Sequence, residues 1–159
     1  MPPAVRASDY EFDDDPARVD RAVLCGFLTT QAYWGRWRNR DAILAQLDDA
    51  WRVAAAYLRS TGQMVGFARA VSDGLALAYL ADVFVLTAHR GHGVGRSLVS
   101  LMIDKGPGRD FRWLLHTADA HGLYAEFGFR QPDQTLLERP AGAGLGQRSG
   151  GPSMIDCGG

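Results

Sequence analysis

The stretch from residue 82 to residue 97 reads DVFVLTAHRGHGVGRS, which has the pattern of a strand, a glycine-rich turn and the start of a helix. Residues 83–86 form a β-branched, aromatic and aliphatic run, typical of a strand buried on both faces. Gly91, Gly93 and Gly95 follow it. Because they lack side chains, backbone N–H groups there can approach an anion at a helix N-terminus, where the helix dipole also favours negative charge. The stretch therefore predicts a phosphate-binding turn.

Two common phosphate-binding motifs do not fit this turn. A P-loop requires a lysine followed by serine or threonine after its last glycine, but Arg96 and Ser97 follow Gly95. The dinucleotide fingerprint requires a glycine where Arg96 stands. The remaining pattern, Arg-x-x-Gly-x-Gly from Arg90, Gly93 and Gly95, resembles the acetyl-CoA pyrophosphate loop of the GNAT family of N-acetyltransferases. An ordinary glycine turn between a strand and a helix is the alternative.

Length and composition restrict the remaining possibilities. The 159 residues suffice for one domain with a sizeable core and are too few to expect two. The formal net charge of −1 gives no general attraction to nucleic acid or to an anionic membrane, and we expect neither as a partner. Cys25 and Cys157 form neither a metal-site spacing nor a disulfide framework. With no signal-peptide or membrane-spanning pattern, this favours a cytoplasmic protein.

The residues before the glycine turn predict antiparallel strands after two helices. We expect a first strand over residues 5–12, a helix over 16–28 started by Asp15 and Pro16, and a short helix over 41–49. Strands are expected over 51–59, 64–71 and 75–85, with glycine-containing turns between them. Three antiparallel strands leading into a glycine turn do not suit a doubly wound nucleotide fold.

The segment between the two predicted helices, residues 29–40, carries three large aromatic side chains and three arginines. Tyr33 and Trp34 are candidates for a lid that binds substrate, because loops carry binding residues and aromatic rings offer a large contact area. The alternative is that Tyr33, Trp34 and Trp37 pack the junction between the helices.

A second motif follows the glycine turn. After a helix over 93–105 and a strand over 111–117, Leu123, Tyr124, Phe127, Gly128 and Phe129 form Leu-Tyr-x-x-Phe-Gly-Phe, which resembles the C-terminal GNAT signature. The strand over 111–117 would be parallel to the strand before the turn. We therefore predict a mixed α/β fold: a single GNAT-like domain over 1–139, with a mostly antiparallel sheet, a central splayed parallel pair and helices on both faces. Residues 140–159 are glycine-rich and are expected to form a flexible tail.

The resemblance implies acetyl-CoA as co-substrate and requires no metal ion. Backbone groups of Val83 and Val85 would bind the pantetheine arm, and N–H groups of residues 90–96, with the Ser97 hydroxyl, would bind the pyrophosphate. The implied cofactor-binding residues are Val83, Phe84, Val85, Arg90, Gly91, His92, Gly93, Val94, Gly95, Arg96 and Ser97.

The same resemblance implies catalytic roles. Tyr124 would protonate the leaving thiolate, since a phenol is protonated at neutral pH. Asp82 is the candidate general base. Where some family members carry a glutamate on this strand, this chain has Tyr79, so that mechanism does not transfer directly. Further candidates around the acceptor, or as proton relays, are Asp119, His121 and His116.

These inferences predict an N-acetyltransferase that acts on a primary amine, with a small-molecule acceptor favoured. A protein N-terminus or lysine as acceptor, and a non-catalytic acyl-CoA-binding module, remain alternatives. By the same resemblance, a homodimer is a possible assembly.

Overall fold

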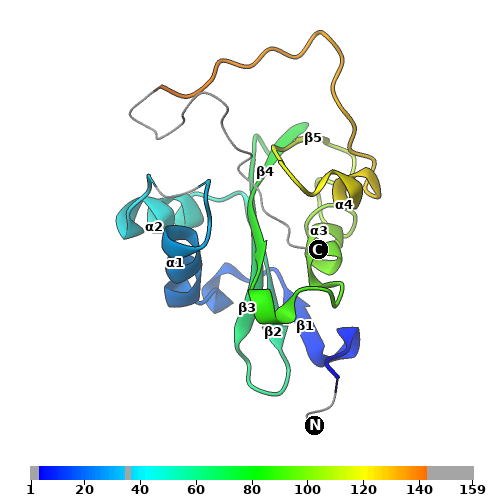
Figure 1. The fold of residues 1–159 in the computed structure, drawn as a ribbon. Coiled ribbons are helices and arrows are strands. Elements are labelled where there is room, and N and C mark those ends of the chain that lie inside the picture. Colours follow the sequence, from blue (N-terminus) through cyan, green and yellow to red (C-terminus); the bar gives the residue numbers. More distant parts are fainter. Residues whose placement is uncertain (1–3, 35–36, 143–159) are drawn as a thin grey trace.

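The computed structural model describes residues 4–34 and 37–142, which build one five-stranded sheet in the order β1-β2-β3-β4-β5. The first four strands pair antiparallel, and β5 is parallel to β4. This confirms the predicted mixed α/β fold with one parallel strand pair (Figure 1). The strands are β1 Tyr10–Asp13, β2 Arg52–Leu58, β3 Met64–Ser72, β4 Leu77–Val85 and β5 Arg112–Leu114.

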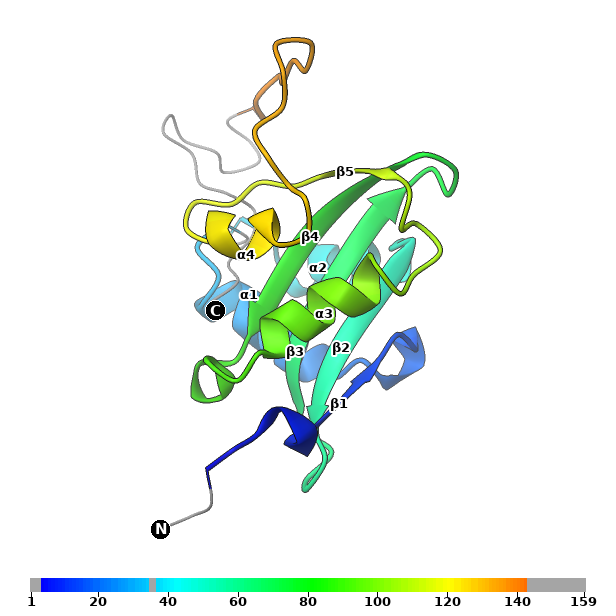
Figure 2. The ribbon, with the colours of Figure 1, turned by 90° about the vertical axis from the view of Figure 1, so that its right-hand side faces the viewer.

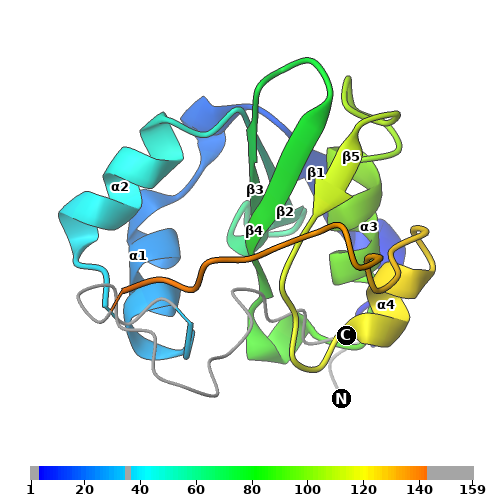
Figure 3. The same cartoon turned by 90° about the horizontal axis from the view of Figure 1, so that it is seen from above.

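Helices cover both faces of the sheet, as Figure 3 shows from above. The helices are α1 Arg21–Thr30, α2 Arg40–Asp48, α3 Val94–Met102 and α4 His121–Ala125. Helices α1 and α2 pack on one face, and α3 lies along the other with α4 beside it (Figure 2). The described residues also contain three short 3₁₀ turns, η1 Ala7–Asp9, η2 Pro16–Arg18 and η3 Thr87–His89.

The strand pattern explains why the sheet is buried on both faces. Successive side chains of a strand point to opposite faces, so the alanine-rich β2 supplies both core clusters. Ala54 and Ala56 belong to the cluster under α3, whereas Val53 and Ala55 belong to the cluster under α1 and α2. A doubly covered strand reads as a continuous apolar run, which the sequence shows here.

Several predicted boundaries shift where side chains bind the backbone. Pro16 starts a 3₁₀ turn, and α1 begins only after Asp20, whose carboxylate accepts the N–H groups of Ala22 and Val23. Asp73 accepts three N–H groups from residues 75–77, which delays β4 to Leu77. The predicted strand over 5–12 becomes η1 and β1, and the strand over 111–117 shrinks to β5. The predicted helix over 93–105 ends at Met102.

The parallel pair opens after a short contact. Its register joins Leu77 to Arg112, Ala78 to Trp113 and Tyr79 to Leu114. Beyond that point β4 continues to Val85 with no β5 partner among the described residues. The predicted splay is therefore present, and it leaves one edge of β4 unpaired. The pair was expected at the centre of the sheet, but among the described residues it lies at one edge, because β5 is the last strand in the order.

The chain beyond α4 continues without helix or strand as far as the structure describes it, to residue 142. In Figure 3 the orange segment 130–142 crosses the end of the sheet from α4 toward α1 and α2. The rest of the predicted tail, including Cys157, lies outside the described residues. Within residues 4–34 and 37–142, no helix has the length and hydropathy to cross a membrane.

Candidate active site

The glycine turn after β4 leaves the start of α3 open. Gly93 is the residue before the helix, has a φ of 78° and supplies no side-chain cap. Gly91 also has a positive φ, of 79°, which side chains other than glycine rarely adopt. A Cβ atom built on either glycine would meet open space within 4 Å. The start of α3 therefore has no side-chain cap, and the two glycines before it place no side chain beside it, as at an anion site of a helix N-terminus.

The charged side chains of this turn are engaged in different ways. The Arg90 guanidinium donates to the Val85 carbonyl at 3.0 Å, and His92 Nδ1 lies 3.2 Å from the His89 carbonyl. Arg96 forms a two-pronged ion pair with Glu126, the residue directly after α4, with N–O distances of 2.7 and 3.0 Å. Glu126 therefore offsets much of the positive charge of Arg96 at the turn.

The unpaired edge of β4 exposes backbone groups beside this turn. Phe84 is paired with Phe67 of β3, and the N–H of Leu86 donates to Val65. Because backbone groups of a strand alternate in direction, those of Val83 and Val85 point away from β3, toward the open side. The contact of Arg90 with the Val85 carbonyl agrees with that direction. The side chain of Phe84 instead stacks on Phe27, with ring centroids 4.0 Å apart.

Tyr124 lies at the opposite side of the splay. Its side chain is 1 % exposed, and its ring meets Phe129 edge-on at 5.6 Å. The neighbouring signature residues Leu123 and Phe127 pack against the core under α3. Tyr124 also lines a cavity of about 590 Å³ that reaches from α4 past the end of β5 to Tyr79 of β4.

Asp82, the expected general base, has a different role. Its side chain is buried, and it occupies a bulge in β4, where the pairing with β3 shifts register and φ is 52°. Arg38 donates to both carboxylate oxygens at 2.8 Å, Arg69 donates at 2.7 Å and the Trp34 indole N–H donates at 3.0 Å.

These partners keep the Asp82 carboxylate ionised and engage both of its oxygens in hydrogen bonds. Burial raises the pKa of Asp82, but the hydrogen bonds and charges of Arg38 and Arg69 outweigh burial, so the net pKa is lowered. A carboxylate that is held ionised by two arginines is a weak proton acceptor. The geometry therefore contradicts the expectation that Asp82 is the general base, and we correct it: Asp82 ties β4 to the segment before α2.

The predicted acceptor residues divide between core and surface. Trp34 is buried against Phe27 and hydrogen-bonded to Asp82, which fits the alternative that it packs the junction between the helices. Tyr33 is 40 % exposed and touches Trp34 edge-on at 5.1 Å. His121 lines the same cavity as Tyr124, whereas Asp119 is exposed and does not line it.

Sequence reasoning missed the two arginines that hold Asp82 and the contact partner of His116. Arg38 and Arg69 lie 44 and 13 residues from Asp82, and no local spacing joins them. Glu138, which contacts His116 at 3.0 Å, lies in a segment without helix or strand. Only the fold brings these groups together.

Comparisons with known proteins agree with this geometry. The family model described as the acetyltransferase (GNAT) family matches residues 33–129, which is more than half of the chain. The chain belongs to the GNAT family. The matched region holds the glycine turn, the splayed strands and Tyr124, so each of these is a feature of a GNAT domain in this protein.

Proteins similar to this GNAT domain include two bacterial structures and one fungal sequence. A structure of a candidate GNAT acetyltransferase from Xanthomonas campestris is 32% identical, with a TM-score of 0.75, over 83% of this chain and 93% of that one. One from Deinococcus radiodurans is 23% identical, with a TM-score of 0.64 over 86% and 92%, and shows the fold alone. A candidate acetyltransferase of Gibberella zeae is 27% identical over 59% of this chain, and the match spans 62% of that relative.

Proposed function

We propose that this GNAT protein transfers an acetyl group from acetyl-CoA to the primary amine of a small molecule. The observation that carries the proposal is the continuous path from the unpaired edge of β4 to the uncapped start of α3. That path offers strand-like hydrogen bonds to an extended amide-containing arm, followed by N–H groups for a diphosphate.

The residues fit such a ligand. A Cβ at Gly91 or Gly93 would project into open space, so neither position is filled by protein. Backbone groups of Val83 and Val85 would hold the amides of the arm, and the start of α3 would hold the diphosphate. Bound acetyl-CoA supplies the activated thioester carbonyl.

Two groups of this chain serve the chemical step. The N–H groups on the open edge of β4 are preorganised donors for the oxygen of a tetrahedral intermediate, and one such donor is worth about 3–4 kcal/mol. Tyr124, at the buried end of the cavity, donates a proton to the sulfur that leaves. No ionised carboxylate is needed for that donation.

Replacing Tyr124 with phenylalanine tests the acid role. We expect Tyr124→Phe to lower kcat by a factor on the order of 10², because the leaving thiolate loses its proton donor, with little change in the Kd of CoA. Release of free thiol from acetyl-CoA, measured over a panel of primary amines, gives the rates.

A matched control is Tyr57→Phe. The Tyr57 hydroxyl is buried with no hydrogen-bond partner among the described residues, so its removal is expected to leave turnover unchanged and stability equal or higher. Equal turnover in the Tyr124 variant and the wild type would remove Tyr124 from the acid role.

A further inference from the structure

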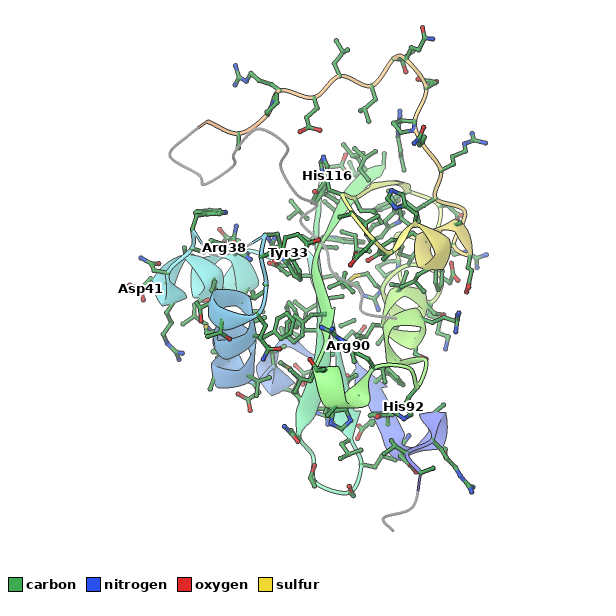
Figure 4. The ribbon with its side chains drawn as sticks, viewed as in Figure 1. Tyr33, Arg38, Asp41, Arg90, His92 and His116 are labelled. Atoms are coloured by element: carbon green, nitrogen blue, oxygen red, sulfur yellow. The ribbon has the colours of Figure 1, made fainter. Side chains whose placement is uncertain are left out.

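A chain of three polar side chains lies at the mouth of the cavity that Tyr124 lines. The Tyr79 hydroxyl lies 2.5 Å from His116 Nδ1, and His116 Nε2 lies 3.0 Å from a carboxylate oxygen of Glu138. The three residues come from β4, the loop after β5 and the segment after α4, and all of them line the cavity. Figure 4 shows His116 toward the end of the sheet opposite Arg90 and His92.

The hydrogen bonds define the state of His116. An ionised carboxylate can only accept, so Glu138 receives the Nε2–H of the imidazole. In the neutral ring Nδ1 then carries no proton and accepts the O–H of Tyr79. A hydroxyl bonded to an imidazole that a carboxylate orients is the arrangement by which proteins remove a proton from a weak acid.

Tyr79 cannot act as a base by itself. Burial and, to a smaller extent, the charge of Glu138 raise the pKa of Tyr79 to about 12, while Arg69 opposes the shift. The phenol therefore stays protonated at neutral pH. It can take a proton from another group only while it passes its own proton to His116.

We propose that Tyr79, His116 and Glu138 form a proton relay that deprotonates the acceptor amine, with His116 as the group that finally holds the proton. The inference rests on the proposed acetyl transfer. As the amine nitrogen bonds to the thioester carbon, its proton moves to the Tyr79 oxygen and the Tyr79 proton moves to His116 Nδ1. The C–S bond then breaks, and Tyr124 protonates the sulfur.

The surroundings of the relay allow it to reset. The His116 side chain is 46% exposed, so the imidazolium can return its proton to water. The cavity that holds the relay is also lined by His121 and Tyr124 of α4 and by Arg130 after it. The charges of Arg69 on β3 and Asp82 on β4 act on Tyr79. Glu138 stabilises the imidazolium while it lasts.

The lining also indicates the class of amine. Leu114, Leu115, Leu136 and Leu137 belong to the same cavity wall, with the relay as a polar patch among them. Such a wall binds an apolar body, and the neutral amino group would lie at the polar patch. The acceptor is therefore a primary monoamine on an aromatic or aliphatic body, for which phenethylamine and tryptamine are suitable probes and spermidine is the polar comparator.

The pH dependence of turnover tests the relay. With the full chain and phenethylamine or tryptamine, the wild-type kcat should rise with pH in the range where an imidazole loses its proton. This rise is one ascending limb in the plot of kcat against pH. His116→Gln should remove that limb and lower kcat by about 10²-fold, with the Kd of CoA unchanged. Glu138→Gln should lower kcat, because the imidazolium loses the carboxylate that stabilises it. Tyr79→Phe should lower kcat without moving the melting temperature by more than the Tyr57→Phe control does.

The matched control for Glu138→Gln is Glu11→Gln, an exposed glutamate of β1 at the other edge of the sheet. It should leave kcat unchanged and the limb in place. Retention of the limb and of wild-type kcat in His116→Gln would overturn the relay while acetyl transfer stood. Absence of thiol release by the wild-type protein would overturn the proposed function itself. A preference for spermidine over both monoamines would overturn the apolar acceptor.

Discussion

At the scale of single residues, the buried carboxylate of Asp82 explains how the site is held. Its strained bulge conformation and its bonds to Arg38, Arg69 and Trp34 join the middle of the sheet to the segment between α1 and α2. Such a cluster gives little net stability compared with a well-packed apolar one, but removing one partner leaves buried charges unpaired.

Replacing Asp82 with asparagine should therefore destabilise the fold strongly. We expect Asp82→Asn to lower the free energy of unfolding by about 3–5 kcal/mol, because two buried guanidinium groups lose their counter-charge. Asp48→Asn, which removes an exposed pair with Arg21, is the matched control and should change stability little. Denaturant unfolding at pH 7 measures both; equal stability of the wild type and the Asp82 variant would contradict the role.

The pH dependence follows from the direction of the shift. The pKa of Asp82 is lower in the folded protein than in the unfolded chain, so its contribution is present above about pH 4 and is lost as the pH falls through the folded value. The stability gap between wild type and Asp82→Asn should therefore narrow in acid. A gap that stays constant from pH 7 to pH 2 would show that the carboxylate charge does not matter.

Prediction at the residue scale succeeded where the cause was local. The glycine turn and the Tyr124 motif were visible because their spacing is short. Asp82 was visible as a candidate functional residue, but its partners were not, since a buried ion pair between distant segments leaves no periodic pattern. The contact of His116 with Glu138 was invisible for the same reason.

At the scale of elements, the start of α3 and the end of β4 form one unit. Gly93 adopts a positive φ directly before the helix, and Arg90 holds the carbonyl of Val85 at the end of the strand. The turn is thereby fixed from both sides while its N–H groups stay exposed to a ligand.

A valine at Gly93 should damage this unit. The positive φ of 78° costs a β-branched residue about 1–2 kcal/mol, and the new side chain would fill the open volume beside the helix start. We expect Gly93→Val to weaken CoA binding by about tenfold or more in a calorimetric titration.

The control for that variant is Gly26→Ala in α1. A Cβ there meets nothing within 4 Å, and an alanine favours the helix by about 0.5–1 kcal/mol. CoA affinity should be unchanged in this control. Wild-type affinity in Gly93→Val would show that the ligand does not use the start of α3.

At the scale of the whole molecule, the fold class and the parallel pairing of the last two strands could be predicted because alternation, turns and the crossover helix all indicated the same topology. The length of β5 could not. Residues 111–117 read as a strand, yet only Arg112–Leu114 pair with β4, because the parallel strands diverge after Tyr79. The divergence that shortens β5 is also what opens the proposed binding edge.

Binding of CoA to the full-length chain tests the central claim most directly. We expect a calorimetric titration at pH 7.5 to give one site per chain, with a Kd on the micromolar scale, and Gly93→Val to weaken it while Gly26→Ala does not. A titration without heat of binding, together with no CoA-dependent change in melting temperature, would contradict the account.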